Sequence, residues 1–187
     1  TMVDKYEAKK FVAERIGEEY VVPTYGVWEK FDDIDFSSLP NQFVLKCTHD
    51  SGGLVICKDK SVLDLNAAKK KIEASLKNNY YLQGREWPYK NVKPRIIAEK
   101  YLEDSSAKEL RDYKIFTFDA VAKVLFVVSE RQEGHTKADY FDVEFKKLDF
   151  TWGYPHSDRL PSAPKTLAHM LEAAQILAKE THELRVD

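Results

Sequence analysis

The sequence has little cysteine and glycine, no long apolar run and almost no net charge. Its 187 residues include two cysteines, Cys47 and Cys57, which are too few for a disulfide framework or a zinc site. The longest purely aliphatic and aromatic run, residues 124–128, is far shorter than the roughly 20 residues that cross a bilayer. Lys plus Arg (29) nearly equals Asp plus Glu (31), which argues against a general nucleic-acid or anionic-membrane binder.

The N-terminus carries no secretory pattern, because residues 1–4 contain neither an apolar core nor a cleavage site. Hydrophobic residues make up 43% of the chain, enough for a folded core. We therefore expect a soluble, globular, cytoplasmic protein that inserts into no membrane and binds no nucleic acid.

Two common nucleotide-binding motifs are missing. The seven glycines form neither G-x-G-x-x-G nor G-x-x-x-x-G-K-[ST], which excludes Rossmann dinucleotide binding and P-loop chemistry through those motifs. The sequence also offers no convincing Ser-His-Asp or Cys-His arrangement for covalent catalysis.

Apolar spacing and turn residues predict an α+β fold with antiparallel sheets and helices on one side. Helices are expected between Asp4 and Gly17, from 65 after the cap Asp64, and from 167 to 178. Strands are expected at 43–47, 54–57, 95–101 and 140–145, with a long hairpin over 113–128 that turns at 119–120.

These elements suggest an N-terminal helical and linker segment (1–42), a first lobe with a glycine loop (43–98) and a second lobe (99–187). A strand begins at Leu184, but the chain stops at Asp187. We therefore expect the second lobe to be incomplete and the fold to be truncated at its C-terminus.

The pair Gly52-Gly53 follows Ser51 in the tip between the first two expected strands. Small residues in such a tip can bring several backbone N–H groups close to a phosphate. An ordinary hairpin turn has the same composition, so the pair alone does not decide between the two.

Two lysines interrupt apolar strands. Lys46 lies in an apolar run just before the glycine pair. Strand alternation places Lys114 on the same face as Asp112, Phe116 and Phe118. A lysine in apolar surroundings needs an anionic partner, and a nucleotide phosphate would serve. The alternatives are a Lys46 side chain that reaches solvent and a structural ion pair between Lys114 and Asp112.

Short matches in order along nearly the whole chain resemble ATP-grasp proteins, most closely the TupA-like branch associated with teichuronopeptide and other surface-polysaccharide biosynthesis. The matching residues are Asp4-Lys5-Tyr6, Leu39-Pro40, 43–47, Ser51-Gly52-Gly53, Asp59-Lys60, Tyr89-Lys90, 94–99, Asp112-Tyr113-Lys114 and Arg185-Val186-Asp187. This resemblance implies two α+β lobes that clamp ATP between them.

The resemblance also implies residue roles. Lys46 would contact the α- and β-phosphates, and Ser51, Gly52 and Gly53 would form a mobile lid. The adenine hinge would be formed by Glu99, Lys100 and Leu102, with Glu99 also near the exocyclic amine. Lys114 would be a second phosphate-facing base, and Asp187 would be a Mg²⁺ ligand. From its place at a strand end, Arg131 could pair with a γ-phosphate or an acidic substrate, or simply face solvent.

The implied reaction is ATP-dependent ligation through an acyl phosphate, with ATP and Mg²⁺ as cofactors and an unknown carboxylate and an amine or sugar acceptor as partners. The glutamate that completes the family's magnesium site lies beyond Asp187, so we expect ATP binding more readily than turnover. The alternatives are a non-catalytic nucleotide-binding or interaction module and a glycosyltransferase-associated protein of polysaccharide synthesis.

Overall fold

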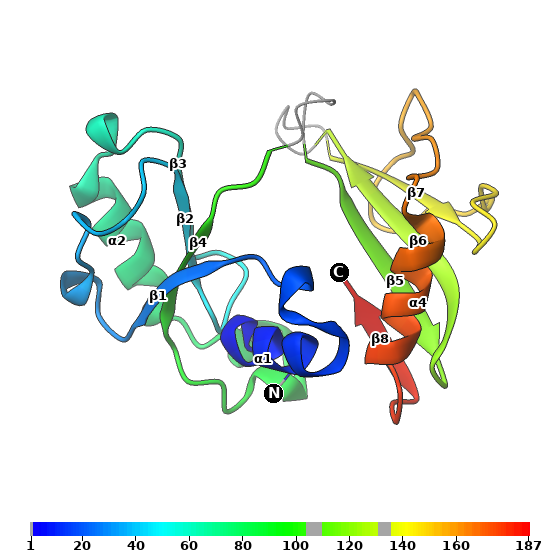
Figure 1. Cartoon of the computed structure of the whole chain (residues 1–187), viewed down its shortest axis with the longest axis horizontal. Coiled ribbons are helices and arrows are strands. Elements are labelled where there is room, and N and C mark those ends of the chain that lie inside the picture. Colours follow the sequence, from blue (N-terminus) through cyan, green and yellow to red (C-terminus); the bar gives the residue numbers. More distant parts are fainter. Residues whose placement is uncertain (1, 104–109, 131–135) are drawn as a thin grey trace. The chain divides into compact units, whose positions relative to one another are not determined.

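The computed structural model describes residues 2–103, 110–130 and 136–187. By its contacts the chain divides into two compact units, residues 1–102 and 103–187. Among the described residues, each unit contains one four-stranded antiparallel sheet, with three α-helices in the first unit and one in the second (Figure 1). The predicted α+β class with antiparallel sheets is therefore confirmed.

The first unit has the strand order β1-β4-β2-β3. Its strands are β1 (Thr24–Trp28), β2 (Phe43–Cys47), β3 (Leu54–Cys57) and β4 (Ile96–Lys100). Its α-helices are α1 (Lys5–Ile16), α2 (Leu65–Leu76) and α3 (Tyr80–Gly84), and single 3₁₀ turns lie at Glu18–Tyr20, Phe31–Asp33, Lys60–Val62 and Trp87–Tyr89.

The core of this unit lies between one face of the sheet and α2. Alternation along β2 places Phe43, Leu45 and Cys47 on this face, where they pack against Ile72 of α2. Helix α2 begins where predicted, because the Asp64 side chain accepts a hydrogen bond from the backbone N–H of Ala67. Burial raises the pKa of the Cys47 thiol, which fits its role as a core residue.

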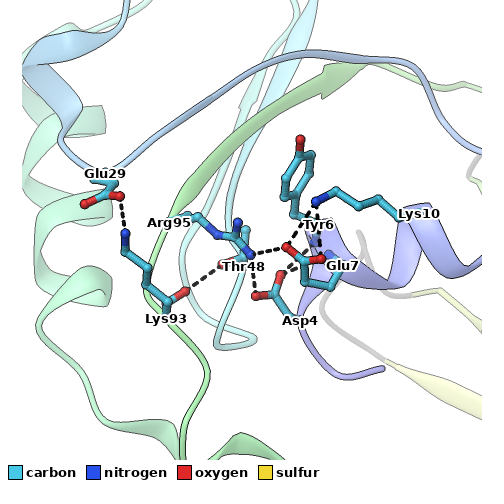
Figure 2. A network of polar contacts seen from close by, with 8 residues as sticks. All are labelled: Asp4, Tyr6, Glu7, Lys10, Glu29, Thr48, Lys93 and Arg95. Carbon is cyan, nitrogen blue, oxygen red and sulfur yellow. Dashed lines mark hydrogen bonds and ion pairs between the residues drawn. The ribbon is translucent and has the colours of Figure 1, made fainter. Parts of the chain in front are cut away.

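Helix α1 is held to this unit by charged side chains. None of its residues is buried, although its N-cap residue Asp4 is. Figure 2 shows Arg95, just before β4, reaching Asp4 at 2.8 Å and Glu7 at 2.9 Å. The same Asp4 carboxylate accepts hydrogen bonds from the N–H groups of Tyr6 and Glu7, so one residue both caps the helix and anchors it.

The second unit has the strand order β7-β6-β5-β8. Its strands are β5 (Asp112–Phe118), β6 (Val121–Ser129), β7 (Lys137–Phe141) and β8 (Glu183–Val186), and its helix is α4 (Leu167–Leu177). The predicted hairpin is β5-β6, and it turns at Asp119 and Ala120, both with positive φ. The core lies between this sheet and α4 and includes Ile115, Leu125 and Ala174.

One strand prediction was wrong in its bounds, and one strand was not predicted. The strand expected at 140–145 is β7, which ends at Phe141, because the Asp142 side chain accepts the N–H groups of Glu144 and Lys146 and folds the chain into a turn. Strand β1 was missed: it pairs with the distant β4, and its residues carry no alternation strong enough to reveal it.

Candidate functional site

The face of the first sheet opposite α2 carries the candidate site. Across neighbouring strands, Val44 lies opposite Glu99 and Lys46 lies opposite Ile97, so all four side chains share this face. Val44 and Ile97 are buried, and the Nζ atom of Lys46 lies 2.6 Å from the Oε2 atom of Glu99. Lys46 therefore has its anionic partner within the protein, while 35% of its side chain stays exposed.

Glu99 is a buried carboxylate with a second ammonium partner. Its Oε1 atom lies 2.7 Å from the Nζ atom of Lys9 on α1. Burial raises the pKa of Glu99, but the charges and hydrogen bonds of Lys46 and Lys9 outweigh it and hold this pKa below its ordinary value. Glu99 is therefore ionised at neutral pH, and the three groups together carry one net positive charge.

A third lysine, Lys5 at the start of α1, lies close to the glycine tip. The Nζ atom of Lys5 donates to the backbone carbonyls of Cys47 and Asp50. Burial lowers its pKa and Lys46 lowers it further, while Asp50 opposes the shift. Sequence analysis assigned no role to Lys5 or Lys9, although both follow the N-cap on one face of α1 at the i, i+4 spacing that would have placed them together.

The glycine tip has two different halves. Ser51 and Gly52 are exposed, and the Ser51 hydroxyl donates to the Tyr80 hydroxyl at 3.2 Å. Gly53 is buried, and its N–H donates to the Asp50 carboxylate at 3.2 Å. A Cβ at Gly53 would overlap the side chains of Ser75 and Cys47. The N–H of Gly53 is thus already engaged, and the part of the tip open to a phosphate is Ser51-Gly52.

The predicted hinge, made of Glu99, Lys100 and Leu102, lies at the end of β4 and just beyond it. The backbone N–H of Lys100 donates to the carbonyl of Pro23 at 3.0 Å, while its side chain and that of Leu102 are exposed. Both carboxylate oxygens of Glu99 have ammonium partners, so an exocyclic amine at this carboxylate would have to share it. The adenine hinge formed by these three residues stays a prediction.

Two apolar residues on the same face were missed by sequence analysis. Leu54 lies opposite Lys46 and Ile56 lies opposite Val44, and both side chains are exposed. The alternation of β3 against β2 would have placed them beside Lys46. An exposed apolar strip next to a cationic group suits a ligand with one flat apolar part and one anionic part.

The second unit brings Lys114 and Asp187 together. On the sheet face opposite α4, the Nζ atom of Lys114 lies 2.6 Å from Asp187 and 3.0 Å from Asp112. Arg185 on β8 also donates to both carboxylate oxygens of Asp187, at 2.7 and 3.1 Å. The ion pair between Lys114 and Asp112, one of the two predicted alternatives, is present.

Several predictions on the site stay predictions. Arg131 lies outside the described residues. Within the ranges that the structure describes, no three His, Cys, Asp or Glu side chains gather as a metal-binding group. The convergence of Lys46 and Lys114 on one triphosphate also stays a prediction, because these residues belong to different units.

Comparison with known proteins decides the family. The family model described as TupA-like ATPgrasp matches residues 1–187, which is the whole chain. The protein belongs to the TupA-like ATP-grasp family. No curated protein and no solved structure matches it.

Membership in the TupA-like ATP-grasp family confirms the predicted resemblance and shows that the chain is an ATP-grasp-type domain. The two antiparallel sheets with their helices are consistent with this fold. Membership in this family supports the binding of a nucleotide, and of ATP in particular. Among the described residues, no helix of this ATP-grasp chain combines the length and the apolar character that crossing a bilayer requires.

Proposed function

We propose that this chain is the ATP-binding region of a ligase that joins a carboxylate to an amine in the biosynthesis of bacterial cell-surface polysaccharide or teichuronopeptide. The observation that carries the proposal is the cluster of Lys46, Glu99 and Lys9 on the sheet face opposite α2, in a chain that matches the ATP-grasp family from end to end. We further propose that the protein acts in the cytoplasm.

In the first unit, Lys46 would bind the α- and β-phosphates of ATP. Its ammonium group is partly exposed, and the cluster has an excess of positive charge, as a polyphosphate site requires. Ser51 and Gly52 would cover the phosphates, because their part of the tip is exposed and free of side-chain bulk. The exposed Leu54 and Ile56, which flank Lys46 on the neighbouring strand β3, would meet the apolar face of the base.

In the second unit, Lys114 would be a phosphate-facing base and Asp187 a Mg²⁺ ligand. Asp112 and Asp187 both pair with the ammonium group of Lys114, so two carboxylates lie around one bound positive charge, which supports the proposal of a cation site. Mg²⁺ commonly binds one or two carboxylates together with substrate phosphates, so this donor set fits it. When bound, Mg²⁺ would neutralise charge on the phosphate oxygens.

The proposed reaction has two steps. A carboxylate oxygen of the substrate attacks the γ-phosphorus of ATP, the bond from that phosphorus to the bridging oxygen breaks, and ADP leaves. An amine then attacks the carbonyl carbon of the acyl phosphate, loses a proton and displaces inorganic phosphate. The protein contributes positioning and positive charge and needs no nucleophile of its own.

A non-catalytic nucleotide-binding module is the second candidate. It is favoured by the close pairing of Lys114 with Asp187, because each group neutralises the other until a ligand separates them. This candidate would bind ATP through the Lys46 face and would show no dependence on Asp187.

Calorimetric titration with ATP, with and without Mg²⁺, tests the proposal. We expect saturable binding that Mg²⁺ strengthens, followed by release of inorganic phosphate when carboxylates and amines are supplied. Absence of binding at millimolar ATP would overturn the proposal, and binding without any effect of Mg²⁺ or phosphate release would favour the non-catalytic module.

A further inference from the structure

Helix α1 reaches the candidate site with Lys5, which donates to backbone carbonyls next to the glycine tip, and with Lys9, which pairs with Glu99. No residue of the helix is fully buried, and the ion pairs of Lys9 and of the N-cap residue Asp4 help to hold it in place. Lys9 is nevertheless well covered, with 15% of its side chain exposed, and it also donates to the carbonyl of Val22. The neighbouring Lys10 is 50% exposed and pairs with Glu7, away from Glu99.

The carboxylate of Glu99 is divided between two lysines. Oε1 faces Lys9 at 2.7 Å and Oε2 faces Lys46 at 2.6 Å. With Lys46 alone, the pair would be neutral and the whole carboxylate charge would oppose a phosphate at Lys46. With Lys9 present, the cluster keeps one net positive charge, and Glu99 is fixed in one orientation from both sides.

We propose that Lys9 is a positioning residue for nucleotide binding, which acts through Glu99 on the charge and direction of Lys46. The inference rests on the proposed function, since it names a further residue of the same site. Lys9 touches no phosphate in this account. Its effect reaches the nucleotide only because Glu99 bonds to both lysines.

The test compares Lys9→Gln with Lys10→Gln, a matched loss of charge one residue away on the same helix, and with Lys9→Arg. Gln keeps a hydrogen-bond donor to Glu99 but removes the charge. We expect Lys9→Gln to weaken ATP binding by about tenfold, which is the scale of one partly buried charge pair. Lys9→Arg should restore most of the affinity, and Lys10→Gln should bind ATP like the wild type.

A second measurement does not depend on ATP. The pKa of Glu99, followed by carbon NMR of its carboxyl group, should rise in Lys9→Gln, because one of the groups that lower it is gone, and should not change in Lys10→Gln. If wild-type protein binds no ATP, the proposed function fails, and an unchanged pKa of Glu99 would overturn the coupling as well.

Equal ATP affinities of Lys9→Gln and Lys10→Gln in folded protein would also overturn the proposal. If Lys9→Gln does not fold, the wild-type protein provides the test. In an NMR titration with ATP, the Nζ signals of both Lys46 and Lys9 should shift, and that of Lys10 should not. A shift confined to Lys46 would contradict the role of Lys9.

Discussion

The Nζ atom of Lys46 and the Oε2 atom of Glu99 lie 2.6 Å apart across the neighbouring strands β2 and β4. The two residues are diagonal neighbours on one sheet face, because Lys46 is opposite Ile97 and Glu99 is opposite Val44. This pairing explains how a lysine can interrupt an apolar strand without a bound ligand. It also means that a phosphate at Lys46 would compete with a carboxylate that the protein holds in place.

The stability of the protein should depend on the ionisation of Glu99. Lys46 and Lys9 hold its pKa below the ordinary value of 4.5, so the stabilisation is fully present above that pH and is lost as the pH falls through the lowered value. In urea unfolding, the difference between the wild type and Glu99→Gln should be largest near pH 7 and should shrink below pH 4.5. Glu29→Gln, which removes an exposed ion pair with Lys93, is the control; a wild-type advantage that grows towards acid pH would contradict the assignment.

Sequence reasoning found the elements whose signals are local. The helix after Asp64 and the hairpin that turns at Asp119 and Ala120 appear as predicted, because a capping side chain and a two-residue turn are encoded within a few residues. Strand β1 and the docking of α1 depend on residues about 70 to 90 positions away, such as Arg95 for Asp4. No pattern within a short window carries that information.

The candidate site was predicted in part for the same reason. Lys46 stands out because a charge interrupts an apolar strand, whereas Lys9 looks like any surface lysine of a helix. The proximity of Lys9 to Glu99 becomes visible only when β4 and α1 are placed side by side. The family resemblance implied that Gly53 belongs to a mobile lid, while its tight packing against Ser75 and Cys47 could not be read from sequence.

The two glycines of the tip should differ in their tolerance of a side chain. A Cβ at Gly53 would overlap Ser75 and Cys47, so Gly53→Ala should destabilise the fold by about 1–3 kcal/mol, as overpacking typically does. A Cβ at Gly52 would meet only Asp50, at 3.7 Å, so Gly52→Ala should have little effect on stability. Thermal unfolding of the two variants checks this, and equal melting temperatures would show that the packing at Gly53 is not as tight as described.

Arg95 should be the main anchor of α1. Its guanidinium group bonds to both Asp4 and Glu7 and is mostly buried, and its hydrogen bond holds the pKa of Glu7 below the ordinary value. Arg95→Met should therefore cost about 2 kcal/mol of stability and loosen the helix. Lys93→Met removes an exposed pair seen in Figure 2 and should change stability by less than about 0.5 kcal/mol. Chemical denaturation measures both, together with hydrogen exchange of the α1 amides; unchanged exchange in Arg95→Met would argue against the anchor.

Asp187 should account for the effect of Mg²⁺ on nucleotide binding. Asp187→Asn removes the charge that pairs with Lys114 and Arg185, so Mg²⁺ should lose most of its strengthening effect on ATP binding. Glu183→Gln changes an exposed residue of strand β8, which ends just before Asp187, and serves as the control. Titrations of each variant with and without Mg²⁺ give the comparison. An undiminished effect of Mg²⁺ in Asp187→Asn would remove this residue from the proposed metal site.

The most direct test of the account is the ATP affinity of Lys46→Met beside that of Lys70→Met, which removes an exposed lysine of α2, the helix that packs on the other face of the sheet. Calorimetry should show ATP binding to the wild type and to Lys70→Met with similar affinity, and binding to Lys46→Met that is about 10- to 100-fold weaker. Circular dichroism would confirm that all three proteins are folded. If folded Lys46→Met binds ATP as tightly as the wild type, the proposed phosphate site on this sheet face is wrong.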